Sequence, residues 1–501
     1  MSIISMQVSS RGLHVGWVTI MLALLASMGG FIFGDDCAFS DVREGLIVSL
    51  LSIGTLVGAL MGAPIADWLG RRYAMTTECG IFIIGVIVQI TSTHVWQQFA
   101  VGRFISGLGV GALSAAVPMV CCPSRVREVL STLTISTLFI TFGILVAYCI
   151  SIGARSIAQS GSWRTVVGIG ILWALILGIG ILFMPETHGR MEEAQVSLAV
   201  TRGIPASEAD KHNFLRREAE GIKQNVEYEK HTKGGWVDCF KPKDKILYRT
   251  LLGMSLQSLQ QLTGANYFFY YGATVFLSVG LSDPYVTQII LGTVNFVCTF
   301  GGMYVMERVR HRPLASASPL FESLTFSSDD DGPSSVEACG NLHGFMIVAA
   351  CLFILGYAMT WAPGVWILIG ETFPTRTRAK QASLSTAGNW MWNFLIAFFT
   401  PFIGSAIGFK YGYVFASCNL LGAVVVYFFL YESSDLTLEE VNMMYTDPTC
   451  KPWTSRQWAP SGYSSRRDLI EKDRSDESNN IEDAQVQNIT GRSCLKILCT
   501  G

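Results

Sequence analysis

The sequence predicts an all-α, polytopic membrane protein built from two helix bundles. Half of its 501 residues are hydrophobic and only 15% are charged, whereas a soluble globular chain carries about a quarter charged residues. The mean hydropathy is +0.39, and about eleven apolar runs reach the ~20 residues that a helix needs to cross a bilayer. The basic residues gather in alternate loops, as the positive-inside rule requires of cytosolic loops.

The apolar runs divide into six spans, a polar loop and five further spans. The first bundle covers 14–184, with spans near 14–34, 45–66, 73–92, 99–120, 129–152 and 165–184. The second covers 248–431, with spans near 251–278, 284–306, 342–370, 384–407 and 411–431. Outside the bundles we expect a cytosolic N-terminus over 1–13, a cytosolic loop with short helices over 185–247, and a cytosolic, largely disordered tail over 432–501.

Two basic clusters of the second bundle conflict with the number of spans between them. "RVRHR" at 308–312 and "RTRAK" at 376–380 are both expected in the cytosol, yet one clear span separates them. The polar segment 313–340 is Ser-rich and acidic, so it cannot cross hydrocarbon as a helix. A ninth helix is therefore expected to be missing. Either a span has been lost or replaced, or the second bundle is assembled incompletely.

The basic loops of the two halves echo each other. "DWLGRR" at 67–72 and "ERVRHR" at 307–312 each follow the second span of a half, and "RVRE" at 125–128 is echoed by "RTRAK". Such repetition is typical of two-bundle transporters that bind their substrate between the halves. Acidic and basic side chains in these loops can pair and hold a cytosolic gate shut. The candidates are Asp67, Arg71, Glu307, Arg308, Glu371, Arg376 and Arg378.

The composition argues against several other classes of protein. Thirteen cysteines are scattered without metal-ligand spacing or a disulfide framework. No nucleophile–base constellation or nucleotide loop stands out, and no basic tract suggests nucleic acid. The sequence therefore predicts a protein that is not an enzyme and that needs neither a metal nor another cofactor.

The stretch "QQLTGANYFFYYG" at 260–272 places carboxamides inside an apolar span. An amide in hydrocarbon is costly without a partner, so such groups usually face a bundle interior or a wet cavity. On a straight helix Gln257, Gln260 and Gln261 share one arc, and a break at Gly264 would swing Asn266 toward the same cavity. Amides and an aromatic ring suit an uncharged polyol. The alternative is that these amides only bond neighbouring helices.

Several motifs resemble the sugar porter family of the major facilitator superfamily, specifically its fungal hexose transporters. They are "GGFIFGDD", "DWLGRR", "GRFISGLGVG", "QQLTGANYFFYYG", "GETFPTRTRAKQASLSTAGNWMWNFLIAFFTPFI" and "LTLEEV", and they cover about residues 14–445 except 313–340. The resemblance implies the major facilitator fold of two six-helix bundles. It also implies transport of a monosaccharide by alternating access, by a monomer in the plasma membrane. Facilitated diffusion and proton symport both stay open.

The resemblance also implies roles for individual residues. Tyr270 and Tyr271 would act as gate residues, and Pro363 and Gly364 would let the tenth helix bend. Asp36 and Arg103 are an intramembrane acid–base pair and the candidates for proton coupling. The substrate-binding candidates are Gln260, Gln261, Asn266, Asn295, Trp366, Asn389 and Asn393.

The sequence departs from the family pattern at several places. Asp35 stands where a tyrosine is usual, the fifth helix lacks its sugar-binding glutamine and has Thr137 near that place, and "CCPSRVRE" lacks an acidic residue and looks shortened. These departures leave two alternatives open: a non-transporting sugar sensor on the same fold, or a carrier made inactive by the loss of a helix. A transporter of another polyol, such as inositol or quinate, is a third.

Overall fold

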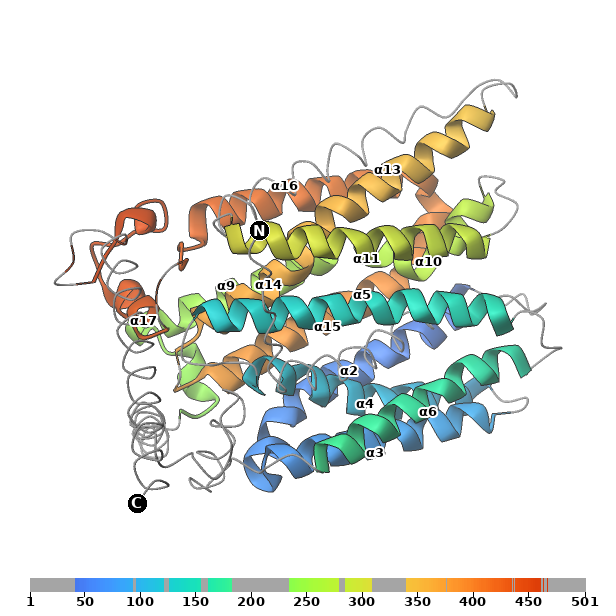
Figure 1. The fold of residues 1–501 in the computed structure, drawn as a ribbon, viewed down its shortest axis with the longest axis horizontal. Coiled ribbons are helices and arrows are strands. Elements are labelled where there is room, and N and C mark those ends of the chain that lie inside the picture. Colours follow the sequence, from blue (N-terminus) through green and yellow to red (C-terminus); the bar gives the residue numbers. More distant parts are fainter. Residues whose placement is uncertain are drawn as a thin grey trace, which may run out of the picture.

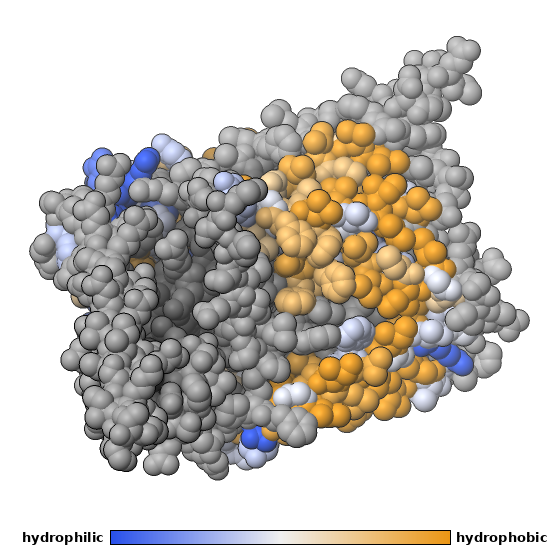
Figure 2. All heavy atoms as spheres, in the orientation of Figure 1, coloured by the Kyte–Doolittle hydropathy of each residue, from blue (hydrophilic) through white to orange (hydrophobic). Residues whose placement is uncertain are grey.

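The computed structural model describes residues 41–92, 96–120, 126–154, 161–182, 234–278, 284–308, 339–374, 376–434, 436, 438–460, 463 and 466. All regular elements within these ranges are helices, so the predicted all-α fold class is confirmed. Eight of the described helical segments are long and apolar enough to cross a membrane. Figure 2 shows a broad hydrophobic surface over the helices, with hydrophilic residues toward the two ends, as expected of a surface that faces lipid.

The first bundle matches five of the six spans predicted for it, because the span predicted near 14–34 lies outside the described residues. Close approach between α2 and α4 depends on small residues: a Cβ at Gly58 would meet Leu108 O, and a Cβ at Gly111 would meet Thr55 O. The helices are α2 (Asp41–Leu69), α3 (Arg71–Ile90), α4 (Trp96–Val120), α5 (Val126–Ala154) and α6 (Gly161–Leu182).

The second bundle contains two predicted spans that are each broken into two helices. The span near 251–278 breaks at Thr263 and Gly264, and the span near 342–370 breaks at Thr360. Gly264 has φ 96°, a backbone conformation that side chains with a Cβ rarely adopt. The helices are α9 (Ile246–Leu262), α10 (Ala265–Ser278), α11 (Pro284–Arg308), α13 (Cys339–Met359), α14 (Trp361–Thr372), α15 (Arg378–Ile407) and α16 (Tyr411–Phe429).

Helices α11 and α13 are neighbours that run in the same direction (Figure 1). Leu291, near the start of α11, packs with Phe353 of α13, while Gly302, near the end of α11, approaches Met359. Helices α11 and α14 therefore end at the same end of the molecule. The cluster "RVRHR" begins at the last residue of α11, and "RTRAK" begins four residues after the end of α14. The expected absence of a ninth helix falls on the polar segment 313–340, most of which lies within residues 309–338, outside the described part.

The two bundles meet along two helix pairs, α2 with α15 and α5 with α11. The first contact is close, because a Cβ added at Gly45 of α2 would lie 2.8 Å from the carbonyl oxygen of Phe398 in α15. The second is also close, because a Cβ added at Gly292 of α11 would lie 2.8 Å from the ring of Tyr148 in α5. These contacts place α11 and α15 beside the first bundle, and α9 packs in turn against α15.

A polar cap lies beyond α9, α14 and α16 at the end of the molecule where the basic clusters lie. It contains the short helices η3 (Val237–Phe240), η4 (Lys243–Lys245), α17 (Leu438–Thr446) and η8 (Ser455–Gln457). The start of the tail that we expected to be largely disordered is thus folded, around the buried side chains of Val441, Met444 and Tyr445.

The guanidinium of Arg466 holds this part of the tail together. Arg466 is buried, and its nitrogens donate hydrogen bonds to four main-chain carbonyls, those of Glu432, Ser434, Ser455 and Trp458, at 2.6–3.0 Å. Residues after Arg466 lie outside the described part.

Candidate functional site

The carboxamide of Asn389, on α15, lies at the centre of a buried hydrogen-bonded cluster with three glutamines of α9. Gln261 Nε2 donates to Asn389 Oδ1 at 2.7 Å. Asn389 Nδ2 in turn lies 2.5 Å from Gln257 Oε1 and 2.9 Å from Gln260 Oε1. All four side chains are buried and none is ionisable. The cluster therefore offers donors and acceptors without the desolvation cost of a charge.

Two further asparagines extend this cluster toward α10. Asn266 Nδ2 donates to Gln261 Oε1. Asn393 Nδ2, one turn along α15 from Asn389, approaches Gln261 Oε1 at 3.4 Å and donates to the Tyr270 hydroxyl at 3.1 Å. The structure thus brings together five of the seven substrate-binding candidates: Gln260, Gln261, Asn266, Asn389 and Asn393.

The break between α9 and α10 is what turns Asn266 toward the glutamines. The helix ends at Leu262, the Thr263 hydroxyl donates to Gln260 O at 2.8 Å, and Gly264 takes its positive φ. Gln260 Nε2 also donates to Trp361 O at 2.9 Å, so the break in this span touches the start of α14. The two broken spans therefore contact each other beside their breaks.

The remaining two substrate-binding candidates lie outside the hydrogen-bonded cluster. Asn295 is buried on α11, and its Oδ1 has no hydrogen-bond partner among the described residues. Trp366 lies on α14 and is partly exposed, between the buried Val365 and Ile367. An acceptor without a partner and an accessible indole both remain available to a ligand.

Tyr270 and Tyr271 lie where the second bundle meets the first. The Tyr271 hydroxyl donates to Ala397 O at 2.6 Å, and both rings pack with Val48 of α2. The Ser52 hydroxyl, also on α2, donates to Asn393 Oδ1 at 2.6 Å. These contacts join the two bundles from the middle of α15 onward, on the side away from the polar cap.

Of the two proton-coupling candidates, only Arg103 is described. Its side chain is buried on α4, its Nε has no hydrogen-bond partner among the described residues, and its guanidinium carbon lies 5.9 Å from the centre of the Phe99 ring. Tyr270 and Tyr271 are its titratable neighbours from α10. Asp36 lies outside the described residues.

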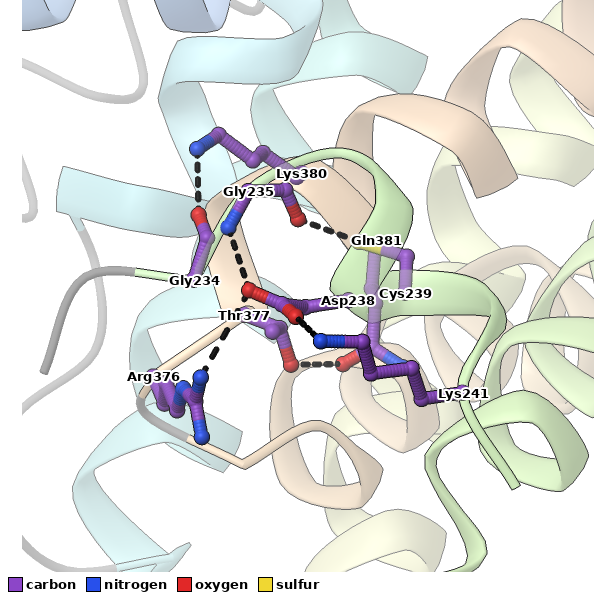
Figure 3. A network of polar contacts seen from close by, with 9 residues as sticks. All are labelled: Gly234, Gly235, Asp238, Cys239, Lys241, Arg376, Thr377, Lys380 and Gln381. Carbon is purple, nitrogen blue, oxygen red and sulfur yellow. Dashed lines mark hydrogen bonds and ion pairs between the residues drawn. The ribbon is translucent and has the colours of Figure 1, made fainter. Parts of the chain in front are cut away.

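A second polar network, at the cap, links the segment before α9 to the loop between α14 and α15 (Figure 3). Asp238 accepts hydrogen bonds from Lys241 Nζ and from the main-chain nitrogen of Gly235, and it pairs with Arg376 at 3.5 Å. Lys380 Nζ donates to Gly234 O. The hydrogen bond from Lys241, then that from Gly235, lowers the pKa of Asp238 below its ordinary value.

Three of the gating candidates have partners within the described part of the chain. Arg376 pairs with Asp238, which the sequence analysis missed although a lysine follows it three residues later in "DCFK". Glu371 accepts a hydrogen bond from the Ser433 hydroxyl at 2.5 Å, and Arg378 Nε donates to Phe373 O at 3.1 Å. The side chains of four candidates lie outside the described part: Asp67, Arg71, Glu307 and Arg308.

Pro363 and Gly364 are buried in the first turn of α14, and the break lies just before them. Thr360 has φ −132° and ψ −71°, and its carbonyl accepts a hydrogen bond from Gly364 N at 2.9 Å. A proline in a first helical turn has no helical hydrogen bond to lose. Pro363 therefore begins the new helix, whereas the change of backbone direction takes place at Thr360.

The sequence of this chain matches a known family over most of its length. Residues 5–445 match the family described as "Sugar (and other) transporter". The chain belongs to this family. It is 39% identical to the "High-affinity glucose transporter ght2" of Schizosaccharomyces pombe, covering 91% of this chain and 92% of that protein. It is also 38% identical to the "Low-affinity glucose transporter HXT3" of Saccharomyces cerevisiae, over 89% and 85% of the two chains.

Solved structures show the same fold. The proton:xylose symporter XylE bound to 6-bromo-6-deoxy-D-glucose superposes with a TM-score of 0.70 at 20% identity, covering 87% of this chain and 99% of that one. The inward-open form of XylE from E. coli superposes with a TM-score of 0.67. The predicted major facilitator fold is confirmed. The family and the apolar helices together make this chain a multi-pass membrane transporter, and not an enzyme.

Proposed function

We propose that this protein carries a hexose across the membrane by alternating access. The observation that carries the proposal is the uncharged carboxamide cluster around Asn389, which lies in the second bundle where it meets the first. A pyranose is uncharged, and each of its hydroxyls both donates and accepts. Carboxamides match such a substrate, whereas charged groups would add a desolvation cost.

The mutual hydrogen bonds of the cluster support an exchange of partners during binding. Asn389, Gln257, Gln260 and Gln261 satisfy one another now, so their buried polar atoms avoid most of the cost of being unpaired. Sugar hydroxyls would replace these mutual hydrogen bonds with similar ones. Trp366 would lie against the apolar face of the ring.

The names of the relatives support hexose as the substrate class, since they are named for glucose and fructose. We propose that the protein works as a monomer in the plasma membrane, with both termini and the polar cap in the cytosol. The basic residues of the cap, such as Arg376 and Lys380, support this orientation. Facilitated diffusion and proton symport through Asp36 and Arg103 are both compatible with it.

Uptake of labelled glucose in cells that lack their own hexose carriers tests the proposal. The parent chain is expected to restore uptake, while Gln261→Ala and Trp366→Ala lose most of it at equal surface amount. A parent that reaches the surface and moves no hexose would overturn the transport function. An epitope inserted between residues 325 and 335 would show separately on which side of the membrane that segment lies.

A further inference from the structure

Gln288, on α11, is a second buried carboxamide whose oxygen is left without a partner. Its side chain is 2% exposed, and its Oε1 has no hydrogen-bond partner among the described residues. Its Nε2 makes one long contact, 3.4 Å, to Phe268 O in α10. An unpaired amide oxygen is costly in a dry interior, and the few such groups in native proteins call for an explanation.

Gln288 shares one face of α11 with Asn295. Seven residues turn an α-helix through almost two full turns, so the two side chains point the same way. They are separated by about 10 Å along the axis. Both end in an amide oxygen that has no partner within the described residues. The unpaired acceptors thus form a row that starts near the α10 gate tyrosines and runs toward the middle of the bundle.

The packing of Gln288 against α10 depends on a glycine. A Cβ added at Gly272, the residue after Tyr271, would lie 2.6 Å from Gln288 Nε2. The amide therefore lies directly under the part of α10 that carries Tyr270 and Tyr271, and these tyrosines join α2 and α15 in the present conformation. Any movement of this part of α10 away from α11 would uncover the amide.

We propose that Gln288 is a specificity-determining residue that binds a hexose hydroxyl between the tyrosine gate and Asn295. This inference rests on the proposed transport function and adds a contact at the gate end of the path. In the closed conformation the amide is covered by α10. In the conformation that opens this end, it receives a hydroxyl of the entering sugar.

The test measures the KM of uptake for glucose and for its monodeoxy analogues, in the carrier-deficient cells. Gln288→Met keeps the length of the side chain and removes the amide. It is expected to raise the KM for glucose about three- to tenfold, the effect of one neutral hydrogen bond. In the parent, one deoxy sugar should bind worse than glucose through loss of the hydroxyl that Gln288 holds, and in Gln288→Met this difference should disappear.

Gln98→Met provides the matched control. Gln98 is a carboxamide on α4 at the same end of the molecule, and it donates to Val88 O and Thr91 Oγ1 within the first bundle. This variant should leave every KM unchanged. A Gln288→Met variant that raises the KM equally for glucose and all deoxy sugars would overturn the proposal, because it would reveal a brace between α10 and α11. If the parent itself transports no hexose, the proposed function fails first, and that outcome is distinct.

Discussion

Asn389 connects every glutamine of the α9 cluster, since its amide nitrogen serves Gln257 and Gln260 and its amide oxygen serves Gln261. The glutamine pair could be predicted from the sequence, because amides in an apolar span demand an interior partner. The identity of that partner could not be derived from chemistry alone, since it depends on how α15 packs against α9. Resemblance to a family indicated Asn389, and its hydrogen bonds to the three glutamines follow from the packing of the two helices.

Replacing Asn389 by alanine should weaken substrate binding strongly. The change removes a carboxamide that would bond a sugar hydroxyl, and it also removes the side chain that holds Gln257, Gln260 and Gln261 in position. The KM for glucose uptake is expected to rise about tenfold or more. Ser405→Ala provides the control, because Ser405 is exposed near the C-terminal end of α15. This variant should transport normally. An unchanged KM in Asn389→Ala would remove the cluster from the substrate path.

The pKa of Asp238 leads to a prediction about pH. Because Lys241 and Gly235 lower this pKa, the charged carboxylate stabilises the segment 235–240, called the docked loop here, at any pH above the ordinary aspartate pKa. That contribution disappears only as the pH falls through the lowered value. After correction for intrinsic exchange rates, amide hydrogen exchange of residues 235–240 should be equal at neutral pH and at about pH 5.

Asp238→Asn should show faster exchange in this segment at both pH values, since the carboxylate is lost. Asp447→Asn is a useful comparison, because Asp447 lies in the tail and is bonded to Thr449 and Trp458 rather than to the docked loop. Protection of residues 235–240 that fell between the two pH values in the parent chain would contradict the assignment.

At the scale of helices, the two broken spans separate what sequence can predict from what it cannot. The break at Gly264 was foreseen, because a glycine followed by an asparagine that must turn inward indicates a change of direction. The break in the other span was expected at Pro363 and Gly364 and lies at Thr360. A proline fits equally well in the first turn of a new helix, so its presence does not fix the residue at which the old helix ends.

Gly264→Ala should damage transport more than its small change in volume suggests. With φ 96°, alanine is strained by about 1–3 kcal/mol, and relief of that strain would rotate Asn266 away from Gln261. We expect reduced uptake and a lower melting temperature of the purified protein. Gly404→Ala on α15, where an added Cβ meets no atom within 4 Å, should change neither quantity.

At the scale of the whole molecule, the two bundles close on each other where α2 crosses α15. The division into two bundles around a polar loop, and the order of the eleven clear spans, were readable from hydropathy and loop charge, whereas the plan of two six-helix bundles came from the family resemblance. The contacts between bundles were not, because Ser52 and Gly45 carry no signal that distinguishes them from other small residues in membrane helices. Which residues face the partner bundle depends on a packing arrangement that a periodic pattern does not encode.

A large side chain at Gly45 should hold this end of the transporter open. A Cβ added there would lie only 2.8 Å from Phe398 O, so Gly45→Trp cannot reach the closed conformation. The purified variant should still bind glucose, measured by intrinsic fluorescence, while its uptake falls to background. Gly80→Trp, where an added Cβ meets no atom within 4 Å, should both bind and transport. Normal uptake by Gly45→Trp would show that closure does not need this contact.

The four main-chain carbonyls that accept hydrogen bonds from Arg466 determine how far this chain can be shortened at its C-terminal side. If the chain is cut after α17 and a fluorescent reporter is fused there, Arg466 is lost. Its guanidinium then no longer ties Glu432, Ser434, Ser455 and Trp458 together. Truncated versions prepared for crystallisation or cryo-microscopy should therefore retain Arg466, with any fusion partner placed after it.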